Sequence, residues 1–255
     1  MLLAIDVGNT QITLGLYEGE ALGPRWRLAT DQERLADEYG ILLVNLFRHA
    51  GTGPEDIHGV ALASVVPPLT ATFEQVCRDY LARVPLVVGA GTKTGVRVKY
   101  EDPKQVGADR IVDAAAVHSL YGGPACIVDF GTATTFDAIS AEGDYLGGAI
   151  APGVAIAAEA LFQRAAKLPK VDLQRPPSPI GKNVVQSLQS GLLFGYVGLV
   201  EGMVARFRAI LGPQMKVVGT GSLAEVIAKE TSVIEILSPW LSLEGMRLIH
   251  DLNAK

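Results

Sequence analysis

The feature that most constrains the fold is a pattern that occurs twice in the sequence. Segment 5–10 (IDVGNT) follows a short apolar run, and segment 127–132 (IVDFGT) follows another such run. We expect each segment to end a strand with an Asp-x-Gly turn. A second apolar segment follows in both cases and ends at a glycine, Gly19 in the first case and Gly143 in the second. Because the motif and the turn spacing both recur, the chain is predicted to contain two halves of the same fold.

Each half continues with the same series of predicted elements. A third strand and a helix follow the turn, and two buried strands come later. These elements are residues 25–29, 33–50, 59–66 and 85–88 in the first half, and 145–150, 154–166, 216–219 and 233–237 in the second. The pattern predicts a duplicated α/β fold, in which βββαβαβ halves at residues 1–122 and 123–255 flank a ligand-binding cleft. The alternative is a single open sheet in which the repeat is a coincidence.

Composition narrows the classes of function. Hydrophobic residues make up 49% of the 255 residues, enough to fill a core, and a net charge of −5 provides no basic surface for nucleic acid. The N-terminus lacks the basic region of a signal peptide, and the apolar stretch 147–158 is shorter than the roughly 20 residues of a membrane span. Cys77 and Cys126 lie in apolar runs that predict buried reduced thiols, and the scattered histidines give no zinc pattern. We therefore expect a cytoplasmic protein that binds neither membranes nor nucleic acid.

The two Asp-x-Gly turns are suited to binding a polyphosphate. A carboxylate at a strand end can hold a metal ion directly or through water, and the glycine lets a phosphate approach the backbone. Asn9 and Thr10 add polar groups to the first turn, and Thr132 and two further threonines follow the second. Either turn alone is more simply explained as a strand end with an Asx cap. Two such turns facing one cleft favour phosphate binding from opposite sides.

Segment 100–110 (YEDPKQVGADR) leads from a loop into a helix. Pro103 and Gly107 indicate the loop, and the apolar spacing from Ile111 onward predicts the helix, so that Asp109 and Arg110 fall in its first turn. An Asp there is favourable in any helix because it complements the helix dipole. An Arg there is unfavourable unless it meets an anion. The segment therefore predicts an acidic substrate.

Together these motifs resemble those of type III pantothenate kinases. DVGNT at 6–10, the Tyr-x-x-Pro-x-x-x-Gly-Ala-Asp-Arg run at 100–110 and DFGTATT at 129–135 are similar to three hallmark motifs of that family, and segments 147–153, 181–183 and 241–248 resemble its later blocks. The resemblance implies a duplicated ASKHA fold (actin-like ATPase, ribonuclease H-like), a homodimer, and phosphoryl transfer from ATP to the 4'-hydroxyl of pantothenate, the first step of coenzyme A synthesis. It also implies Mg²⁺ and a monovalent cation, K⁺ or NH₄⁺.

The resemblance also implies roles for individual positions. The first phosphate loop would bind ATP through Asp6, Val7, Gly8, Asn9, Thr10, Gln11, Ile12 and Thr13, with Asp6 near the Mg²⁺, and Thr132 would also contact ATP. Asp129 would bind the monovalent cation. Pantothenate would be bound by Tyr100, Gly107, Ala108, Asp109, Arg110 and Val184, with Asp109 as the proton acceptor. This agrees with the chemistry, because an alcohol that attacks a γ-phosphoryl group needs alignment, charge neutralisation and a carboxylate to accept its proton.

Two positions depart from the family pattern. The residue after Gly-[Arg/Lys]-Asn is commonly a Thr that contacts pantothenate, and here it is Val184, whose side chain cannot form a hydrogen bond. A Thr-Gly-Gly turn near the C-terminal strand is Thr220-Gly221-Ser222 here, so the second turn position lacks glycine's freedom to adopt a positive φ.

Two other functions remain as alternatives. One is an ASKHA kinase that acts on a sugar or a carboxylic acid, and the other is a non-catalytic regulatory or binding protein that keeps the fold. The presence of Asp6, Asp109 and Asp129 together argues against the second alternative, since a binding module needs no base. The long helical stretch 184–211 alternates apolar and small residues, and we expect it to lie in the core rather than at an interface.

Overall fold

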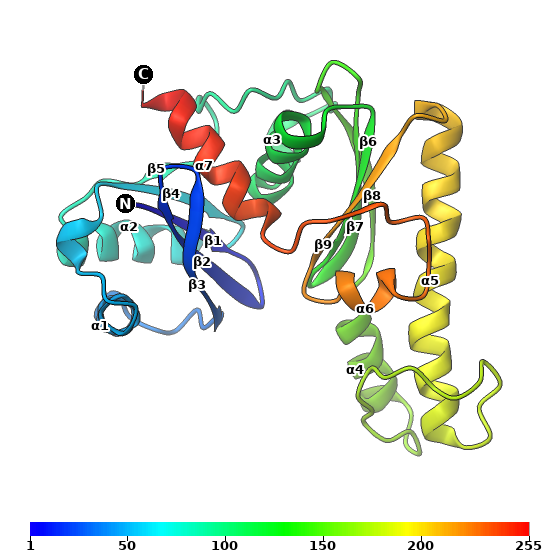
Figure 1. Cartoon of the computed structure of the whole chain (residues 1–255). Helices are drawn as coiled ribbons and strands as arrows, with labels where there is room; N and C mark the ends of the chain where they lie inside the picture. The colour runs from blue at the N-terminus through cyan, green and yellow to red at the C-terminus, as the bar shows by residue number, and fades with distance from the viewer. Residues whose placement is uncertain (255) are drawn as a thin grey trace. The chain divides into compact units, whose positions relative to one another are not determined.

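The computed structural model describes residues 1–254 and divides into two compact units. The first unit is Met1–Leu120 together with the C-terminal segment that begins at Leu241, and the second is Tyr121–Trp240. Each unit contains one five-stranded mixed sheet (Figure 1). The strand order is β3-β2-β1-β4-β5 in the first sheet and β10-β9-β6-β7-β8 in the second. The predicted duplicated fold is therefore confirmed, and a single open sheet is excluded.

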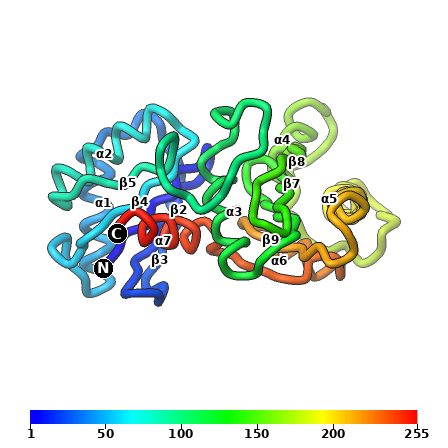
Figure 2. Tube along the Cα trace, turned by 90° about the horizontal axis from the view of Figure 1, so that it is seen from above, coloured from blue at the N-terminus to red at the C-terminus, as the bar shows by residue number. Residues whose placement is uncertain are grey.

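The first sheet places its most buried strands at the centre. β1 pairs antiparallel with β2 and parallel with β4, and each of the two central strands β1 and β4 buries its apolar residues on both faces. Helices α1 and α2 pack together on one side of this sheet, and α7 lies on the other (Figures 1 and 2). The elements are β1 (Leu2–Val7), β2 (Gln11–Glu18), β3 (Ala21–Ala29), α1 (Ala36–His49), η1 (Pro54–Asp56), β4 (Gly59–Ser64), α2 (Pro67–Leu81), β5 (Leu86–Val87), η2 (Pro103–Gln105), α3 (Ala108–Tyr121) and α7 (Leu241–Asn253).

The second sheet repeats the first strand by strand. β6 pairs antiparallel with β7 and parallel with β9, as β1 does with β2 and β4. Asp6 stands opposite Thr13 and Ala63 in the first sheet, and Asp129 stands opposite Thr135 and Thr220 in the second. The elements are β6 (Ala125–Phe130), β7 (Ala133–Ile139), β8 (Tyr145–Pro152), α4 (Val154–Arg164), α5 (Val184–Leu211), β9 (Lys216–Gly221), α6 (Ala224–Ala228) and β10 (Ile236–Leu237). The two Asp-x-Gly motifs thus occupy equivalent places in equivalent sheets.

Helix α7 belongs to the first unit, whereas the sequence analysis placed all of residues 123–255 in the second half. Its buried residues, among them Met246 and Ile249, pack on the side of β1 and β4. Gly245 lies so close to α3 that a Cβ at this position would collide with the carbonyl oxygen of Val112. Because an amphipathic helix can cover either sheet equally well, its place in the chain does not show which core it joins.

By length and composition alone, helix α5 is apolar enough to cross a membrane. The expectation that no segment is long enough rested on the shorter apolar stretch 147–158 and is therefore corrected. The buried residues of α5 recur along one face of the helix and pack into the core of the second unit. They are Leu192, Leu193, Val197, Val200 and Val204. The opposite face is exposed, so the prediction of a core position is correct for one face of this helix only.

Each unit has one cysteine in its core. Cys77 of α2 belongs to the hydrophobic cluster of the first unit and Cys126 of β6 to that of the second. Both thiols are fully buried and free. Burial raises the pKa of each thiol to about 12, so both stay protonated and unreactive in the folded protein. The prediction of buried reduced cysteines is confirmed.

Candidate active site

The turn between β1 and β2 forms a small polar loop at the end of the central strand. The N–H of Gly8 donates to the carbonyl of Gln11 at 3.0 Å, and a Cβ at Gly8 would lie 2.9 Å from that oxygen. Thr30, which follows β3, donates through Oγ1 to the carbonyl of Gly8 at 2.7 Å and through its N–H to that of Thr10 at 3.1 Å. Asn9 and Thr10 are exposed at the tip. Hydrogen bonds from Thr30 therefore hold the loop, and its polar tip residues are exposed.

The other predicted ATP-binding positions of this segment divide between loop and core. The side chains of Val7 and Ile12 are fully buried in the first hydrophobic cluster, so only their backbone groups can face a ligand. Gln11 and Thr13 are partly buried, and Nε2 of Gln11 donates to Oγ1 of Thr13 at 3.3 Å. The side chains that can reach a phosphate from this segment are thus Asp6 and the polar residues from Asn9 to Thr13.

Asp6 and Asp109 form a pair of interacting carboxylates in the first unit. Asp6 ends β1 and is partly buried, and Asp109 lies in the first turn of α3. The pKa of Asp6 is raised to about 7, mainly by burial and also by the nearby charge of Asp109, while a hydrogen bond from the Ser242 hydroxyl opposes both effects. Such a strongly perturbed pKa in a group beside a polar loop is characteristic of functional sites. Two residues 103 positions apart in the chain thus meet at one site.

Local contacts hold the carboxylate of Asp109 at the start of α3. Burial raises its pKa, while the N–H of Arg110, which donates to Oδ1 at 2.8 Å, and the charge of Arg110 lower it. A Cβ at Gly107 would collide with Oδ1 of Asp109, so a side chain at position 107 would displace this carboxylate. The carbonyl of Gly107 accepts the N–H of Ile111 at 3.3 Å and begins the helix. The predicted position of Asp109 in the first helical turn is confirmed.

The other predicted substrate-binding residues of the first unit surround this turn. Ala108 and Arg110 are partly buried at the start of α3, and Tyr100 lies in the preceding loop with 37% of its surface exposed. An anion placed at this helix start would meet the positive end of the α3 dipole and the Arg110 guanidinium. The segment thus offers a cation for an acidic substrate beside a carboxylate that can accept a proton.

The second Asp-x-Gly turn belongs to the second unit and is held even more tightly. The N–H of Gly131 donates to the carbonyl of Ala133 at 3.0 Å. Gly221, which ends β9, has a φ of +88°, and a Cβ there would collide with Oδ1 of Asp129. The carboxylate of Asp129 therefore sits against backbone where no side chain other than hydrogen fits.

Thr132 and Ser222 complete the description of this turn. The carbonyl of Thr132 accepts the N–H of Gly153 at 3.1 Å, and a Cβ at Gly153 would collide with that carbonyl oxygen, which fixes Thr132 to the start of α4. Among the described residues, the positive φ of the Thr220-Gly221-Ser222 turn falls on Gly221 and not on Ser222. The serine that departs from the family pattern therefore occupies a position that does not need glycine.

Val184 is the first residue of α5 and lies on the surface of the second unit. Its side chain is 49% exposed and lines an open cavity of about 540 Å³ with Leu168, Gly181, Lys182, Asn183, Ser187 and Leu188. Asn183 caps the helix, since its side chain accepts the N–H of Gln186 at 2.9 Å. Val184 is therefore not a core residue, and a polar side chain at this position would meet solvent.

The carboxylates of the first unit fit a hard divalent cation. No group of three or more metal-binding side chains occurs among residues 1–254, and Mg²⁺ characteristically takes only one or two carboxylates together with water and substrate phosphates. Asp6, with its pKa raised by burial and by Asp109, gains most from a nearby positive charge. The donor set thus matches Mg²⁺ delivered with a nucleotide rather than a metal caged by protein ligands.

Three supporting residues were not predicted from the sequence. Thr30, which follows β3, donates a hydrogen bond to the first turn. Gly153 leaves room for the carbonyl of Thr132 in the second turn, and Ser242 of α7 is hydrogen-bonded to Asp6. Thr30 and Ser242 lie more than 19 positions from the motifs that they contact. Thr30 stands in no recognisable pattern, whereas Ser242 lies in the segment 241–248 that resembles a family block. Gly153 lies in the segment 147–153 that resembles a family block, which is the one signal that pointed to it.

Solved structures place the fold in a broad class. The chain is similar to a Baf family transcriptional activator from Campylobacter jejuni (TM-score 0.64, 18% identity, 99% of this chain and 98% of that one). It is also similar to an ADPNP-bound activator of 2-hydroxyisocaproyl-CoA dehydratase from Clostridium difficile (0.55, 13%, 99% and 96%) and to a ROK hexokinase from Thermus thermophilus (0.51, 16%, 100% and 99%). These identities show the fold alone, which is that of the actin-like ASKHA ATPases and kinases.

Sequence comparisons identify the family within this class. The family model for type III pantothenate kinase matches residues 2–206. Curated type III pantothenate kinases of Moorella thermoacetica and a Roseiflexus species are both 53% identical over 253 residues, which are 99% of this chain and 100% and 99% of those proteins. That of Geobacter sulfurreducens is 52% identical over the same length. The chain therefore belongs to the type III pantothenate kinase family, as the motifs predicted, and it is a kinase.

The raised pKa of Asp6 predicts a stabilising mutation. The pKa is about 7 in the folded protein and 3.8 as its ordinary value, so the folded state binds more protons between these pH values and the free energy of unfolding falls as pH rises through them. Asp6→Asn removes the buried charge. In the absence of ligands we expect it to raise the free energy of unfolding by about 1–3 kcal/mol at pH 8 and to have little effect near pH 4.

Urea denaturation of the two proteins at both pH values measures this difference. Asp79→Asn, which removes an exposed carboxylate, serves as the control and should change stability by less than about 0.5 kcal/mol at either pH. An Asp6→Asn protein that is less stable than wild type at pH 8 would contradict the assignment of a costly charge to Asp6.

Proposed function

We propose that this chain transfers the γ-phosphoryl group of ATP to the 4'-hydroxyl of pantothenate, forming 4'-phosphopantothenate in the first step of coenzyme A synthesis. The full-length similarity to curated type III pantothenate kinases supports the substrate. The observation that carries the chemistry is the pair Asp6 and Asp109, two interacting carboxylates beside a polar loop and a helix start. Release of ADP from ATP in the presence of Mg²⁺ and K⁺, dependent on added pantothenate, tests the proposal.

The roles of the two carboxylates follow from their surroundings. Asp6, at the end of β1 next to the Gly8–Thr10 turn, holds the Mg²⁺ that accompanies the ATP phosphates, with the turn residues up to Thr13 near the phosphoryl oxygens. Asp109 accepts the proton of the 4'-hydroxyl as its oxygen bonds to the γ-phosphorus and the bond to the β-phosphate oxygen breaks. Bound Mg²⁺ neutralises charge that develops on the phosphates. Arg110, at the same helix start, pairs with the pantothenate carboxylate.

Asp109→Asn tests the proton acceptor. The amide keeps the size of the side chain but cannot accept a proton, so we expect kcat to fall by about 100-fold or more while the KM for ATP changes little. Steady-state ADP release measures both constants. Glu101→Gln, which neutralises an exposed carboxylate of the preceding loop, should keep wild-type turnover. An Asp109→Asn enzyme with turnover near that of wild type would remove Asp109 from the mechanism.

Asp129 is proposed as the ligand of a monovalent cation, K⁺ or NH₄⁺, with Thr132 in contact with ATP. The support is the crowded position of the Asp129 carboxylate against Gly221 and its place in the sheet, equivalent to that of Asp6. A monovalent cation there would offset the negative charge of the carboxylate beside a phosphate-binding turn.

We expect activity to be low in Na⁺ or Li⁺ buffers and to rise when K⁺ or NH₄⁺ is added, because the larger ions are the ones that the family resemblance implies. Asp129→Ala should remove this response, since the charge that binds the cation is lost. Initial rates in the four chloride salts, with protein dialysed free of ammonium, measure it. Equal rates in all four salts would exclude a monovalent cation from the mechanism.

Val184 is proposed to line the pantothenate pocket in place of the threonine that is common in the family. Its exposed side chain and the cavity around it support a position open to a ligand. Relative to that threonine, this chain lacks one hydrogen bond, worth about 0.5–1.5 kcal/mol in a typical case. Because the contact is remote from the transferred phosphoryl group, its loss affects the ground state and the transition state alike.

Val184→Thr should therefore lower the KM for pantothenate by about 2- to 10-fold and leave kcat and the KM for ATP unchanged. The substitution is nearly isosteric at a half-exposed site, so thermal stability should also be unchanged. Val185→Thr, which alters a neighbouring exposed side chain of the same helix turn, is the matched control. An unchanged KM in Val184→Thr would show that the pocket lies elsewhere.

A cytoplasmic homodimer is the form that we propose for the enzyme. The exposed apolar side chains of α4 and α5 support self-association, among them Ile156, Phe162 and Ile210. Gly191, Gly195 and Gly198 follow one another along α5 and face open space, which lets a second helix approach closely. A twofold dimer would bury the same surface on both copies. The partners proposed are thus pantothenate and a second copy of the chain, without nucleic acid or membrane.

A further inference from the structure

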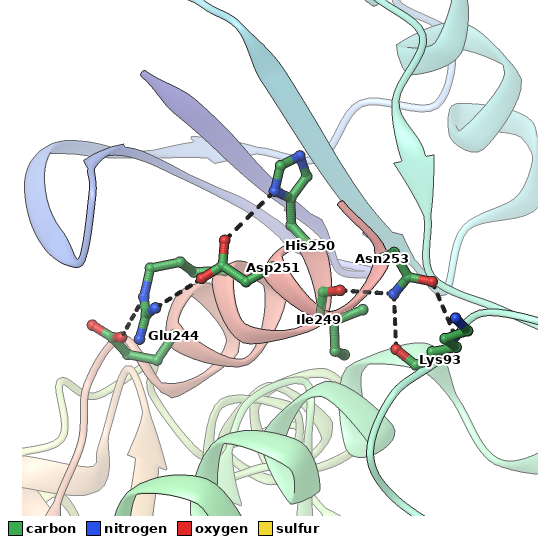
Figure 3. A network of polar contacts seen from close by, with 7 residues as sticks. Lys93, Glu244, Ile249, His250, Asp251 and Asn253 are labelled. Atoms are coloured by element: carbon green, nitrogen blue, oxygen red, sulfur yellow. Dashed lines mark hydrogen bonds and ion pairs between the residues drawn. The ribbon is translucent and has the colours of Figure 1, made fainter. Parts of the chain in front are cut away.

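One side chain of the C-terminal helix pairs with the backbone of a loop 160 positions away. Nδ2 of Asn253 donates to the carbonyl of Lys93 at 2.8 Å, and the N–H of Lys93 donates to Oδ1 of Asn253 at 3.2 Å (Figure 3). Nδ2 also donates to the carbonyl of Ile249 within α7 at 2.7 Å. The carboxamide therefore satisfies both backbone groups of Lys93 as a neighbouring strand would. We refer to this paired contact as the Asn253 clamp.

The loop that the clamp holds leads to the proposed substrate site. Residues 88–107 connect β5 to α3 and contain one short regular element, η2 (Pro103–Gln105). Connections of this length without much secondary structure of their own are usually functional. Tyr100 lies in this loop and Gly107 ends it, next to Asp109. The conformation of the loop therefore decides where two of the proposed pantothenate-binding residues lie.

Packing beneath the clamped part of the loop is incomplete. A cavity of about 210 Å³ is lined by Thr94 and Gly95 of the loop and by residues of α3 and α7, which are Ala115, His118, Ser119, Leu248, Asp251 and Leu252. Side chains that fill such a space would hold the loop by dispersion and burial, and a cavity supplies neither. The two hydrogen bonds between Asn253 and Lys93 therefore join the loop to α7 beside incomplete packing.

The same helix reaches the other parts of the site at its opposite end. Ser242, in the first turn of α7, is hydrogen-bonded to Asp6, and Gly245 packs directly on the backbone of α3 at Val112. Charged side chains farther along α7 form ion pairs with one another. The Arg247 guanidinium lies 3.6 Å from a carboxylate oxygen of Glu244 and 3.1 Å from one of Asp251 (Figure 3). One rigid helix thus contacts β1, α3 and the substrate loop.

We propose that Asn253 is a positioning residue that holds loop 88–107 in the conformation that binds the acidic substrate. The inference rests on the proposed function, because it takes Tyr100 and segment 107–110 as the binding site. It concerns a residue outside the segment 2–206 that matches the family model. Since the clamp uses the backbone of Lys93, the identity of the side chain at position 93 is unimportant.

The expected effect of breaking the clamp is on substrate binding rather than on the chemical step. Loss of two hydrogen bonds of ordinary strength lowers the equilibrium constant for attachment of the loop by about tenfold or more, and for a loop that is only marginally attached the apparent affinity falls by about the same factor. Bound pantothenate then restores the loop, so the rate from the complete complex changes little. Asn253→Ala should therefore raise the KM for pantothenate about 10-fold, while kcat and the KM for ATP change less than about twofold.

Hydrogen exchange of the full-length protein without ligands gives a readout that does not depend on activity. Amides of residues 93–107 should exchange faster in Asn253→Ala than in wild type, while those of α3 keep their protection. Asn253→Asp serves as a second variant, because its carboxylate still accepts the N–H of Lys93 but repels the carbonyls of Lys93 and Ile249. Lys93→Ala and Asp251→Asn are the matched controls, and both should keep the wild-type KM for pantothenate and wild-type exchange in the loop.

The outcomes separate this inference from the proposed function. Faster exchange in the loop together with a raised KM for pantothenate in both Asn253 variants supports the inference. Unchanged exchange overturns it, and so does faster exchange at an unchanged KM. If Asp109→Asn, assayed in parallel, keeps its turnover, the active-site assignment itself fails, whatever the Asn253 variants show.

Discussion

The site depends on one carboxylate that the fold holds in a partly buried position. Asp6 ends the central strand of the first sheet, where β2 and β4 flank it on both sides. Burial and the charge of Asp109 both disfavour the ionised form of Asp6, and the pairing of β1 with its neighbours keeps the residue at this position. A cation bound with nucleotide phosphates relieves this unfavourable interaction.

Three separate elements have to meet for this arrangement to exist. β1 brings Asp6, α3 brings Asp109, and α7 brings Ser242. Glycines make the close approaches possible, since a side chain at position 107 would collide with Asp109 and one at position 245 with the backbone of α3. The geometry of the site thus depends on close approaches at two glycines as well as on the polar residues themselves.

Much of the fold could be predicted because local chemistry and global topology agree in it. The two Asp-x-Gly turns mark equivalent strands, and the structure places Asp6 and Asp129 at the same register of sheets with the same strand order. The position of Asp109 in the first turn of α3 also followed from loop and helix signals. By contrast, nothing in the amphipathic pattern of α7 indicates which sheet it covers, so its return to the first unit could not be predicted.

The details of the site were harder to predict for the same reason. Val7 and Ile12 stand within a polar motif, but strand alternation points their side chains into the core. The hydrogen bonds of Thr30 and Ser242 join segments that are distant in the chain, and no short-range pattern records them. For α5, the alternation of apolar and small residues predicted the helix but did not show that one face is buried and the other exposed. Contacts between elements therefore require the structure, whereas the elements themselves largely do not.

The two buried cysteines give each unit its own chemical reporter. A thiol with a pKa near 12 and no exposed surface reacts with a disulfide reagent only when the surrounding core opens. Cys77 reports on the first unit and Cys126 on the second, and neither lies among the residues proposed to bind ligands. Labelling rates followed by mass spectrometry of the two cysteine peptides would thus separate the opening of one unit from that of the other. The native chain can reveal which half nucleotide or pantothenate makes more rigid, without any engineered probe.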